Sequence, residues 1–157
     1  MAEPPEDWPD LAGRIDGKRH ILPVRVYHED TDFTGLVYHG ALVRFFERGR
    51  SDFIRLLGVG HTELLEGTHG AEPAAFVVRH MEIDFLKPAG IGDVLEVVTH
   101  IDEIGGATLT LLQEVMRDDA VLTRARVKIV VLSRAGKPVR LATFIRGPLE
   151  RFLNQES

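Results

Sequence analysis

Residues 27–39 carry side chains whose types and spacing fit an attack on a carbonyl group. An alternating apolar run predicts a strand that ends at two aspartates, Asp30 and Asp32. A turn at Gly35 and a short apolar segment follow, and His39 stands where a long helix is predicted to begin. This order brings together a carboxylate, an imidazole and free helix N–H groups. Such groups attack a carbonyl and stabilise the charge that develops on its oxygen.

The surrounding sequence predicts the elements that must position these groups. The predicted strands are residues 21–27, 75–87, 93–102, 107–117 and 120–133, and the predicted helices are 40–57, 61–66 and 141–153. Gly49 falls on the apolar face of the long helix, where the missing side chain permits a close approach to a sheet. The order of elements predicts an α+β fold in which a continuous antiparallel meander wraps around the long helix.

Length and composition indicate a single ordinary domain. The 157 residues are 44% hydrophobic and 27% charged, which is enough for a real core. Residues 1–19 are acidic and proline-containing at their start, so we expect a flexible N-terminal arm followed by one domain over residues 20–153. No apolar run approaches the roughly 20 residues that a membrane span requires.

Charge and cysteine content narrow the class of function. The net charge is −5 and basic residues are scattered, so we expect no nucleic-acid partner. The chain has no cysteine, which fits a reducing compartment and excludes disulfides and thiolate chemistry. The N-terminus does not resemble a signal peptide. We therefore expect a soluble, cytoplasmic protein without a transmembrane segment.

The residues before the long helix also have plainer interpretations. His39 and Gly40 are poor helix caps, so the first N–H groups need a partner, which is either a substrate oxygen or water. Asp32 could instead be a turn residue that accepts bonds from nearby backbone N–H groups, and we prefer that interpretation for Asp30. A metal site on His28, His39 and these aspartates lacks the usual ligand spacing, so we expect no metal and no other cofactor.

Three motifs give the chain a resemblance to a known family. They are E-D-T-D at residues 29–32, G-L-V-Y-H at residues 35–39 and E-R-G-R at residues 47–50. The segment F-L-K-P-A with G-D at residues 92–93 forms a weaker second match. Over roughly residues 20–150 the chain resembles the hot-dog-fold acyl-CoA thioesterases. Within them it is most similar to the Tol–Pal-associated YbgC-type group, which is related to the 4-hydroxybenzoyl-CoA thioesterases.

The resemblance implies a function and a set of site residues. It implies hydrolysis of acyl-CoA to free acid and CoA, a hot-dog fold, and homodimers or homotetramers with active sites at the dimer interface. By motif position, Asp32 would be the catalytic carboxylate and His39 its neighbour at the helix start. We predict that Tyr38, Gly40 and Lys87 bind substrate, with Lys87 beside the CoA phosphates.

The chain also departs from the family pattern. Relatives often carry Tyr where this chain has His28, and the pair Phe33 and Thr34 is bulkier than usual, which bears on the acyl pocket. Gly49 replaces an Ala and concerns packing. Lys87, Arg134 and Lys137 border predicted strand ends, where a solvated surface charge is the plainer interpretation of each.

Two other functions remain open alongside hydrolysis. One is a hot-dog hydratase or dehydratase, whose His and carboxylate normally follow a different local pattern. The other is a non-catalytic module that binds acyl-CoA or an envelope-associated protein partner. For hydrolysis itself, Asp32 could attack the thioester directly or activate a water as general base, and the sequence favours neither route.

Overall fold

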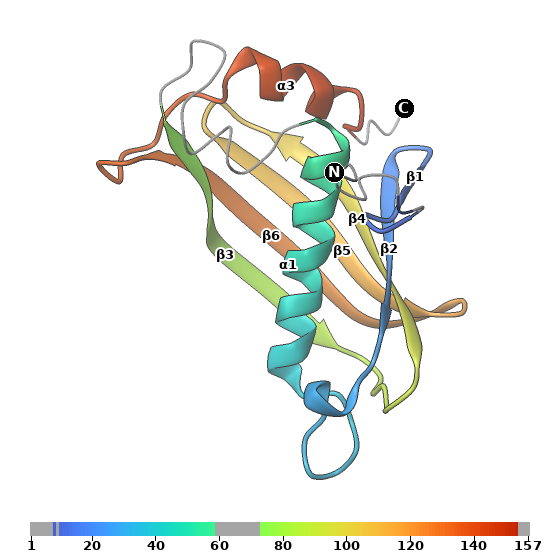
Figure 1. The fold of residues 1–157 in the computed structure, drawn as a ribbon. Helices are drawn as coiled ribbons and strands as arrows, with labels where there is room; N and C mark the ends of the chain where they lie inside the picture. Colours follow the sequence, from blue (N-terminus) through green and yellow to red (C-terminus); the bar gives the residue numbers. More distant parts are fainter. Residues whose placement is uncertain (1–7, 9, 59–72, 154–157) are drawn as a thin grey trace, which may run out of the picture.

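The computed structural model describes residue 8 and residues 10–58 and 73–153. Over these residues one six-stranded sheet curves around a long helix that lies on its concave face (Figure 1). The strands are β1 (Arg14–Asp16), β2 (Arg19–Arg25), β3 (Ala74–Phe85), β4 (Val94–Ile104), β5 (Thr108–Arg117) and β6 (Ala120–Ser133). The helices are α1 (His39–Leu56), α3 (Thr143–Glu150) and the 3₁₀ turn η1 (His28–Asp30). The predicted α+β architecture is confirmed, and the predicted helix at 61–66 lies outside the described residues.

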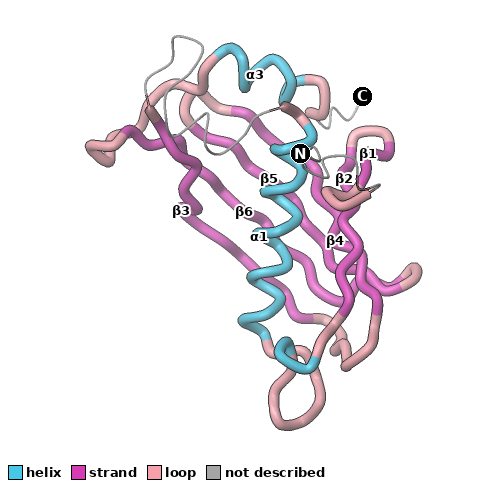
Figure 2. The backbone as a smooth tube through the Cα atoms, in the orientation of Figure 1, coloured by secondary structure: helices cyan, strands magenta, loops and turns pink. Residues whose placement is uncertain are grey.

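The order of strands in the sheet corrects the predicted meander. The strands lie in the order β1-β2-β4-β5-β6-β3, and every neighbouring pair is antiparallel. Only β4, β5 and β6 follow one another as a meander, whereas β3 occupies the edge of the sheet and pairs with β6 (Figure 2). Alternation of apolar residues identifies a strand but not its partner, so the sequence could not show this crossover. The connection 86–93 therefore runs from the edge strand back to β4.

An apolar stripe holds α1 against the sheet. Its buried residues recur at helical spacing and are Ala41, Leu42, Phe45, Phe46, Gly49, Phe53 and Ile54. At Gly49 an added Cβ would lie 2.7 Å from Cγ1 of Val97, a distance that real Cβ atoms do not reach. The predicted close approach of the helix at Gly49 is confirmed, and Gly49 lets α1 sit directly on β4.

The sheet begins earlier in the chain than the sequence indicates. Residues 14–16, within the predicted N-terminal arm, form β1 and pair with β2. His20 on β2 is fully buried, and its Nε2 lies 2.7 Å from the Ala12 carbonyl oxygen. This bond and the β1–β2 ladder tie residues 12–16 of the predicted arm to the sheet.

At the other end of the chain, α3 covers one end of the sheet (Figure 1). It lies within the predicted helical segment 141–153, and Leu141, Ile145 and Leu149 are buried. None of the helices in the described part of the chain is long and apolar enough to cross a membrane.

Candidate active site

A buried aspartate shapes the loop that leads into α1. Asp30 is 4% exposed, and its Oδ2 accepts a hydrogen bond from the Tyr27 N–H at 2.9 Å. Its carbonyl oxygen accepts a second bond from the Tyr38 N–H, also at 2.9 Å. The turn interpretation of Asp30 is confirmed, since this residue links the end of β2 to the start of the helix.

Asp32 lies on the same loop with its side chain exposed. Its Oδ1 accepts hydrogen bonds from the Thr34 hydroxyl and, at 2.8 Å, from the Thr34 N–H. The Asp32 N–H donates to the Leu36 carbonyl at 3.0 Å and closes the loop. The Thr34 hydroxyl, followed by the Thr34 N–H, lowers the pKa of Asp32 below its usual value. Asp32 is thus both a turn residue and a group that stays ionised well into the acid range.

The start of α1 presents backbone donors that no acceptor in the described part of the chain satisfies. Tyr38 is the N-cap residue, and no side chain caps the first turn. The Tyr38 carbonyl accepts from the N–H groups of Ala41 at 2.9 Å and Leu42 at 3.4 Å. Within the described residues, the N–H groups of His39 and Gly40 have no acceptor. Two donors at the positive end of a helix favour a negatively charged partner.

A cavity of about 330 Å³ lies between this loop, the start of α1 and the end of β3. Its lining residues are Asp32, Leu36, Val37, His39, Leu42, Phe85, Leu86, Lys87, Pro88, Ala89, Leu122 and Thr123. Three predicted site residues, Asp32, His39 and Lys87, are therefore brought to one cavity. Tyr38 and Gly40, the other two, are not among its lining residues.

Aromatic rings surround the helix start. The Tyr38 and His39 ring centroids are 4.3 Å apart, and the ring of Phe85 meets His39 at 6.2 Å in an edge-on arrangement. A Cβ added at Gly40 would lie 2.6 Å from the Tyr38 ring. A side chain at position 40 would therefore displace the exposed Tyr38 ring, which packs over the first turn and does not line the cavity.

The connection between β3 and β4, residues 86–93, forms a second wall of the cavity. Asp93, in the G-D match at residues 92–93, holds this connection in place. Oδ2 of Asp93 accepts from the Gly90 N–H at 2.9 Å and from Nη1 of Arg117 at 2.8 Å. The bond from the Gly90 N–H, followed by the bond from Arg117, lowers the pKa of Asp93. The carboxylate therefore stays charged and keeps both hydrogen bonds. The Val37 N–H donates to the Ala89 carbonyl at 2.8 Å. This bond joins the Asp32 loop to the wall that carries Lys87.

Among the lining residues that the sequence analysis did not assign to the site are Thr123 and Phe85. Thr123 on β6 is 1% exposed, and its hydroxyl has no hydrogen-bond partner among the described residues. Phe85 on β3 pairs with Thr123 in the sheet and is 53% exposed. A signal existed for Thr123, because the alternation of β6 places this polar residue in register with the inward-facing Ala125 and Val127.

These features define a class of protein: a helix-on-sheet fold in which a carboxylate and the uncapped start of the helix, at His39, meet at one cavity. The part of the chain that the structure describes contains no group of three His, Asp or Glu side chains that could hold a metal ion. An ionised carboxylate beside unpaired N–H donors fits acyl transfer to water at a thioester or ester.

Comparison with known proteins identifies the family. The thioesterase superfamily model matches residues 34–123, more than half of the chain, and the chain belongs to this superfamily. It therefore belongs to a family of hot-dog thioester hydrolases.

Individual relatives agree with this assignment. The chain is 42% identical over 108 residues to the acyl-CoA thioesterase YbgC of Haemophilus influenzae, covering 69% of this chain and 76% of that protein. It is 38% identical over 109 residues to the acyl-CoA thioester hydrolase YbgC of Escherichia coli O6:H1, covering 69% and 78%. A probable thioesterase from Bartonella henselae superposes with a TM-score of 0.76 at 44% identity, covering 79% of this chain and 99% of that chain. The predicted resemblance to the YbgC group is confirmed.

Proposed function

We propose that this protein hydrolyses acyl-CoA thioesters to the free acid and CoA, with Asp32 as the catalytic carboxylate. The observation that carries the proposal is the shared cavity, which brings an ionised Asp32 to the uncapped start of α1. The names of the YbgC relatives, which are acyl-CoA thioesterases or thioester hydrolases, support CoA as the thiol.

The chemistry needs few groups because a thiolate is a good leaving group. Asp32 either attacks the thioester carbon, giving a mixed anhydride that water then cleaves, or removes a proton from an attacking water. The His39 and Gly40 N–H groups would donate to the carbonyl oxygen as it becomes an oxyanion. One such donor is typically worth about 3 kcal/mol to the transition state. His39 would orient the substrate or the water.

Lys87 is proposed to bind the CoA side of the substrate. It is exposed at the edge of the cavity, beyond the last residue of β3, whereas Leu42, Ala89 and Leu122 form buried walls. An ammonium group at the rim can attract a phosphate, and an apolar wall can take the acyl group. The interaction would be screened by salt because the lysine faces solvent.

The decisive test replaces Asp32 by Asn, which keeps the shape but cannot act as a base or nucleophile. We expect kcat for acyl-CoA hydrolysis, measured by release of free thiol, to fall by roughly 10²–10⁴-fold with folding unchanged. Asp118→Asn is the matched control, since Asp118 is an exposed turn residue away from the cavity and should keep full activity. Unchanged turnover in Asp32→Asn would remove the assignment. Loss of water from a 3-hydroxyacyl-CoA, or addition of water to an enoyl-CoA, without release of thiol would favour a dehydratase or a hydratase.

We also propose that the protein assembles as a homodimer or homotetramer through the edge strand β3. This strand has twelve residues, and only one of its sides is paired, with β6. Apolar side chains along and just beyond it are exposed, namely Val77, Val78, Phe85 and Leu86 at 39%, 42%, 53% and 52%. A long apolar edge strand is a template for pairing with another chain. An envelope-associated partner and a cytoplasmic location stay predictions.

A further inference from the structure

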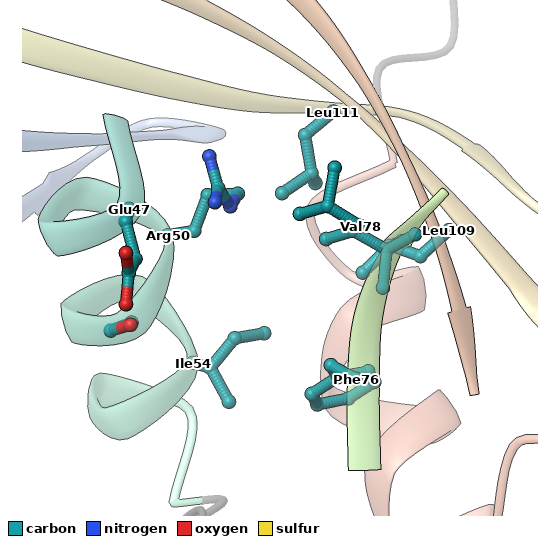
Figure 3. A pocket seen from close by; sticks show the side chains of 9 residues that line it. Glu47, Arg50, Ile54, Phe76, Val78, Leu109 and Leu111 are labelled. Carbon is teal, nitrogen blue, oxygen red and sulfur yellow. The ribbon is translucent and has the colours of Figure 1, made fainter. Parts of the chain in front are cut away.

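A second cavity of about 310 Å³ lies between the later turns of α1 and the concave face of the sheet (Figure 3). Its lining residues are Glu47, Arg50, Ser51, Ile54, Phe76, Val78, Leu109, Leu111 and Ile129. None of these residues lines the cavity beside Asp32. The walls are mainly apolar, and Arg50 extends from the helix into the space (Figure 3).

The guanidinium of Arg50 is held in one orientation by a buried amide. Nη1 of Arg50 donates to Oε1 of Gln113 at 3.1 Å. Gln113 is fully buried, and its Nε2 donates to the Phe46 carbonyl at 3.0 Å and to the Thr99 hydroxyl oxygen at 2.9 Å. Both amide donors are therefore used inside the core, so the amide oxygen must face Arg50. The guanidinium is positioned before any ligand arrives.

The charge of Arg50 has no counter-ion in direct contact. No carboxylate among the described residues lies within 4.0 Å of its guanidinium, and Glu47 acts on it only at longer range. Arg50 is half-buried, and this burial lowers the pKa of its guanidinium from the usual value. A guanidinium has five N–H donors, and Gln113 takes one. The remaining donors can therefore serve an anion.

We propose that this cavity binds the carboxylate end of a short hydrocarbon chain, with Arg50 holding the carboxylate. The planar guanidinium matches a carboxylate with two parallel hydrogen bonds. The apolar walls, such as Ile54, Phe76 and Leu111, would cover the hydrocarbon. The cavity of about 310 Å³ lies at the small end of ligand-binding cavities, which suits a short chain. The site does not depend on the proposed hydrolysis, and it gives the E-R-G-R motif a function.

The test compares octanoate with octan-1-ol, which share a chain length but differ in charge. Titration calorimetry at neutral pH should show octanoate binding at least tenfold more tightly than octan-1-ol. Arg50→Met should abolish that preference. Arg48→Met is the matched control, because Arg48 is exposed on the same helix over the Phe45 ring and does not line the cavity. Equal binding of the two probes, or unchanged octanoate binding in Arg50→Met, would overturn the proposal.

A second measurement uses the unaltered protein in case Arg50→Met fails to fold. Phenylglyoxal modifies accessible arginines, and peptide mass mapping reports each one separately. Octanoate should slow the modification of Arg50 at least severalfold and leave that of Arg48 unchanged. An unchanged rate of Arg50 modification in the presence of octanoate would contradict the proposal. The same result is expected if octanoate binds beside Asp32 instead.

Two sources of the carboxylate are distinguished by competition. One source is a free carboxylic acid, and the other is the far end of a dicarboxylic acid whose first end is joined to CoA. The competition uses Asp32→Asn, so that the competitors are not hydrolysed during the titration. Displacement of octanoate by suberyl-CoA but not by octanoyl-CoA would assign the thioester source, whereas displacement by neither would assign the free acid. Both results support the carboxylate site. A protein that binds octanoate at Arg50 but hydrolyses no thioester would leave this site standing while the proposed function fails.

Discussion

At the scale of single residues, Thr34 determines how Asp32 ionises. Its hydroxyl and N–H both donate to Oδ1 of Asp32, and both bonds favour the charged carboxylate. Because its pKa is lowered, Asp32 stays ionised at a lower pH than an ordinary aspartate. A reaction that needs the carboxylate is therefore lost only when the pH falls below this lowered pKa. Asp32 is exposed, and the lowering of its pKa therefore comes from hydrogen bonding and not from burial.

Removal of the Thr34 hydroxyl should shift the acid limb of activity. In Thr34→Ala the pKa of Asp32 rises toward its usual value, so kcat/KM should begin to fall at a higher pH than in the unaltered protein. The measurement is a pH profile of thiol release on the acid side of neutrality. Thr31→Ala is the control, since the Thr31 hydroxyl donates to the His28 carbonyl and not to Asp32. Coincident acid limbs for Thr34→Ala and the unaltered protein would contradict this role.

At the scale of elements, the contact of α1 with β4 depends on a missing side chain. The Cβ of any residue larger than glycine at position 49 would press on Val97, and also lie 3.3 Å from Nε2 of Gln113 and 3.4 Å from Oγ1 of Thr99. All three neighbours are buried, so they have little freedom to move. The helix can therefore pack on the sheet in only one position.

We expect Gly49→Val to lower the free energy of unfolding by about 1–3 kcal/mol through overpacking. Urea unfolding followed by circular dichroism would measure the change. Arg44→Val on the exposed side of α1 introduces the same β-branched side chain without the clash, and its helix-propensity cost should be less than about 1 kcal/mol. Equal effects at the two positions would show that the clash is relieved by movement of the helix.

The docking of β1 on β2 rests on a buried neutral histidine. The Nε2–H of His20 donates to the Ala12 carbonyl, its ring stacks on Phe53 at 5.4 Å, and its Nδ1 has no partner among the described residues. Burial lowers the pKa of His20, with partial compensation by the bond to Ala12 and by Asp52. A proton on Nδ1 would place a charge where no described acceptor receives it.

This histidine should make stability fall as the pH falls below neutral. The unfolded chain takes up a proton near the ordinary pKa of about 6.5, while folded His20 does not until a lower pH, so unfolding is favoured between these values. His20→Gln should reduce this loss, measured as the difference in the urea midpoint between about pH 7.5 and about pH 5.5. His28→Gln, at an exposed position, is the control and should retain the full loss. An undiminished pH dependence in His20→Gln would exclude His20 as its source.

At the scale of the whole molecule, the edge strand β3 is the surface through which we propose that the protein assembles. It is long and carries exposed apolar residues, and neither a neighbouring strand nor a helix of the described chain pairs with its outer side. Natural proteins block such an edge with charge or cover it with a partner. A second copy of the chain would cover it.

We expect Val77→Lys to convert the assembled protein into a monomer, measured by size-exclusion chromatography with light scattering. A lysine on an edge strand is a charge that opposes strand pairing. Val94→Lys is the matched control, because Val94 is 50% exposed but lies on the inner strand β4. Val94→Lys should leave the assembly unchanged. A monomeric unaltered protein would contradict the proposed interface.

Much of the fold and part of the site could be predicted from the sequence alone. Period-two and helical spacing gave β4, β5, β6 and α1 to within a few residues, because a buried face imposes its own repeat on the chain. The order Asp32, Gly35, His39 indicated a carboxylate beside a helix start, since these residues are close in sequence. Gly49 indicated a close contact between helix and sheet, because its place on the apolar face can be determined from the spacing within the helix alone.

Only the tertiary structure decided which distant segments meet. It placed β3 at the sheet edge beside β6, and it thereby brought Phe85, Lys87 and Thr123 to the cavity of Asp32. It also placed Arg50 on Gln113, a residue 63 positions away in the chain. A residue pattern reports which face of its own element is buried, whereas strand partners and cavities depend on contacts between elements that leave no local repeat.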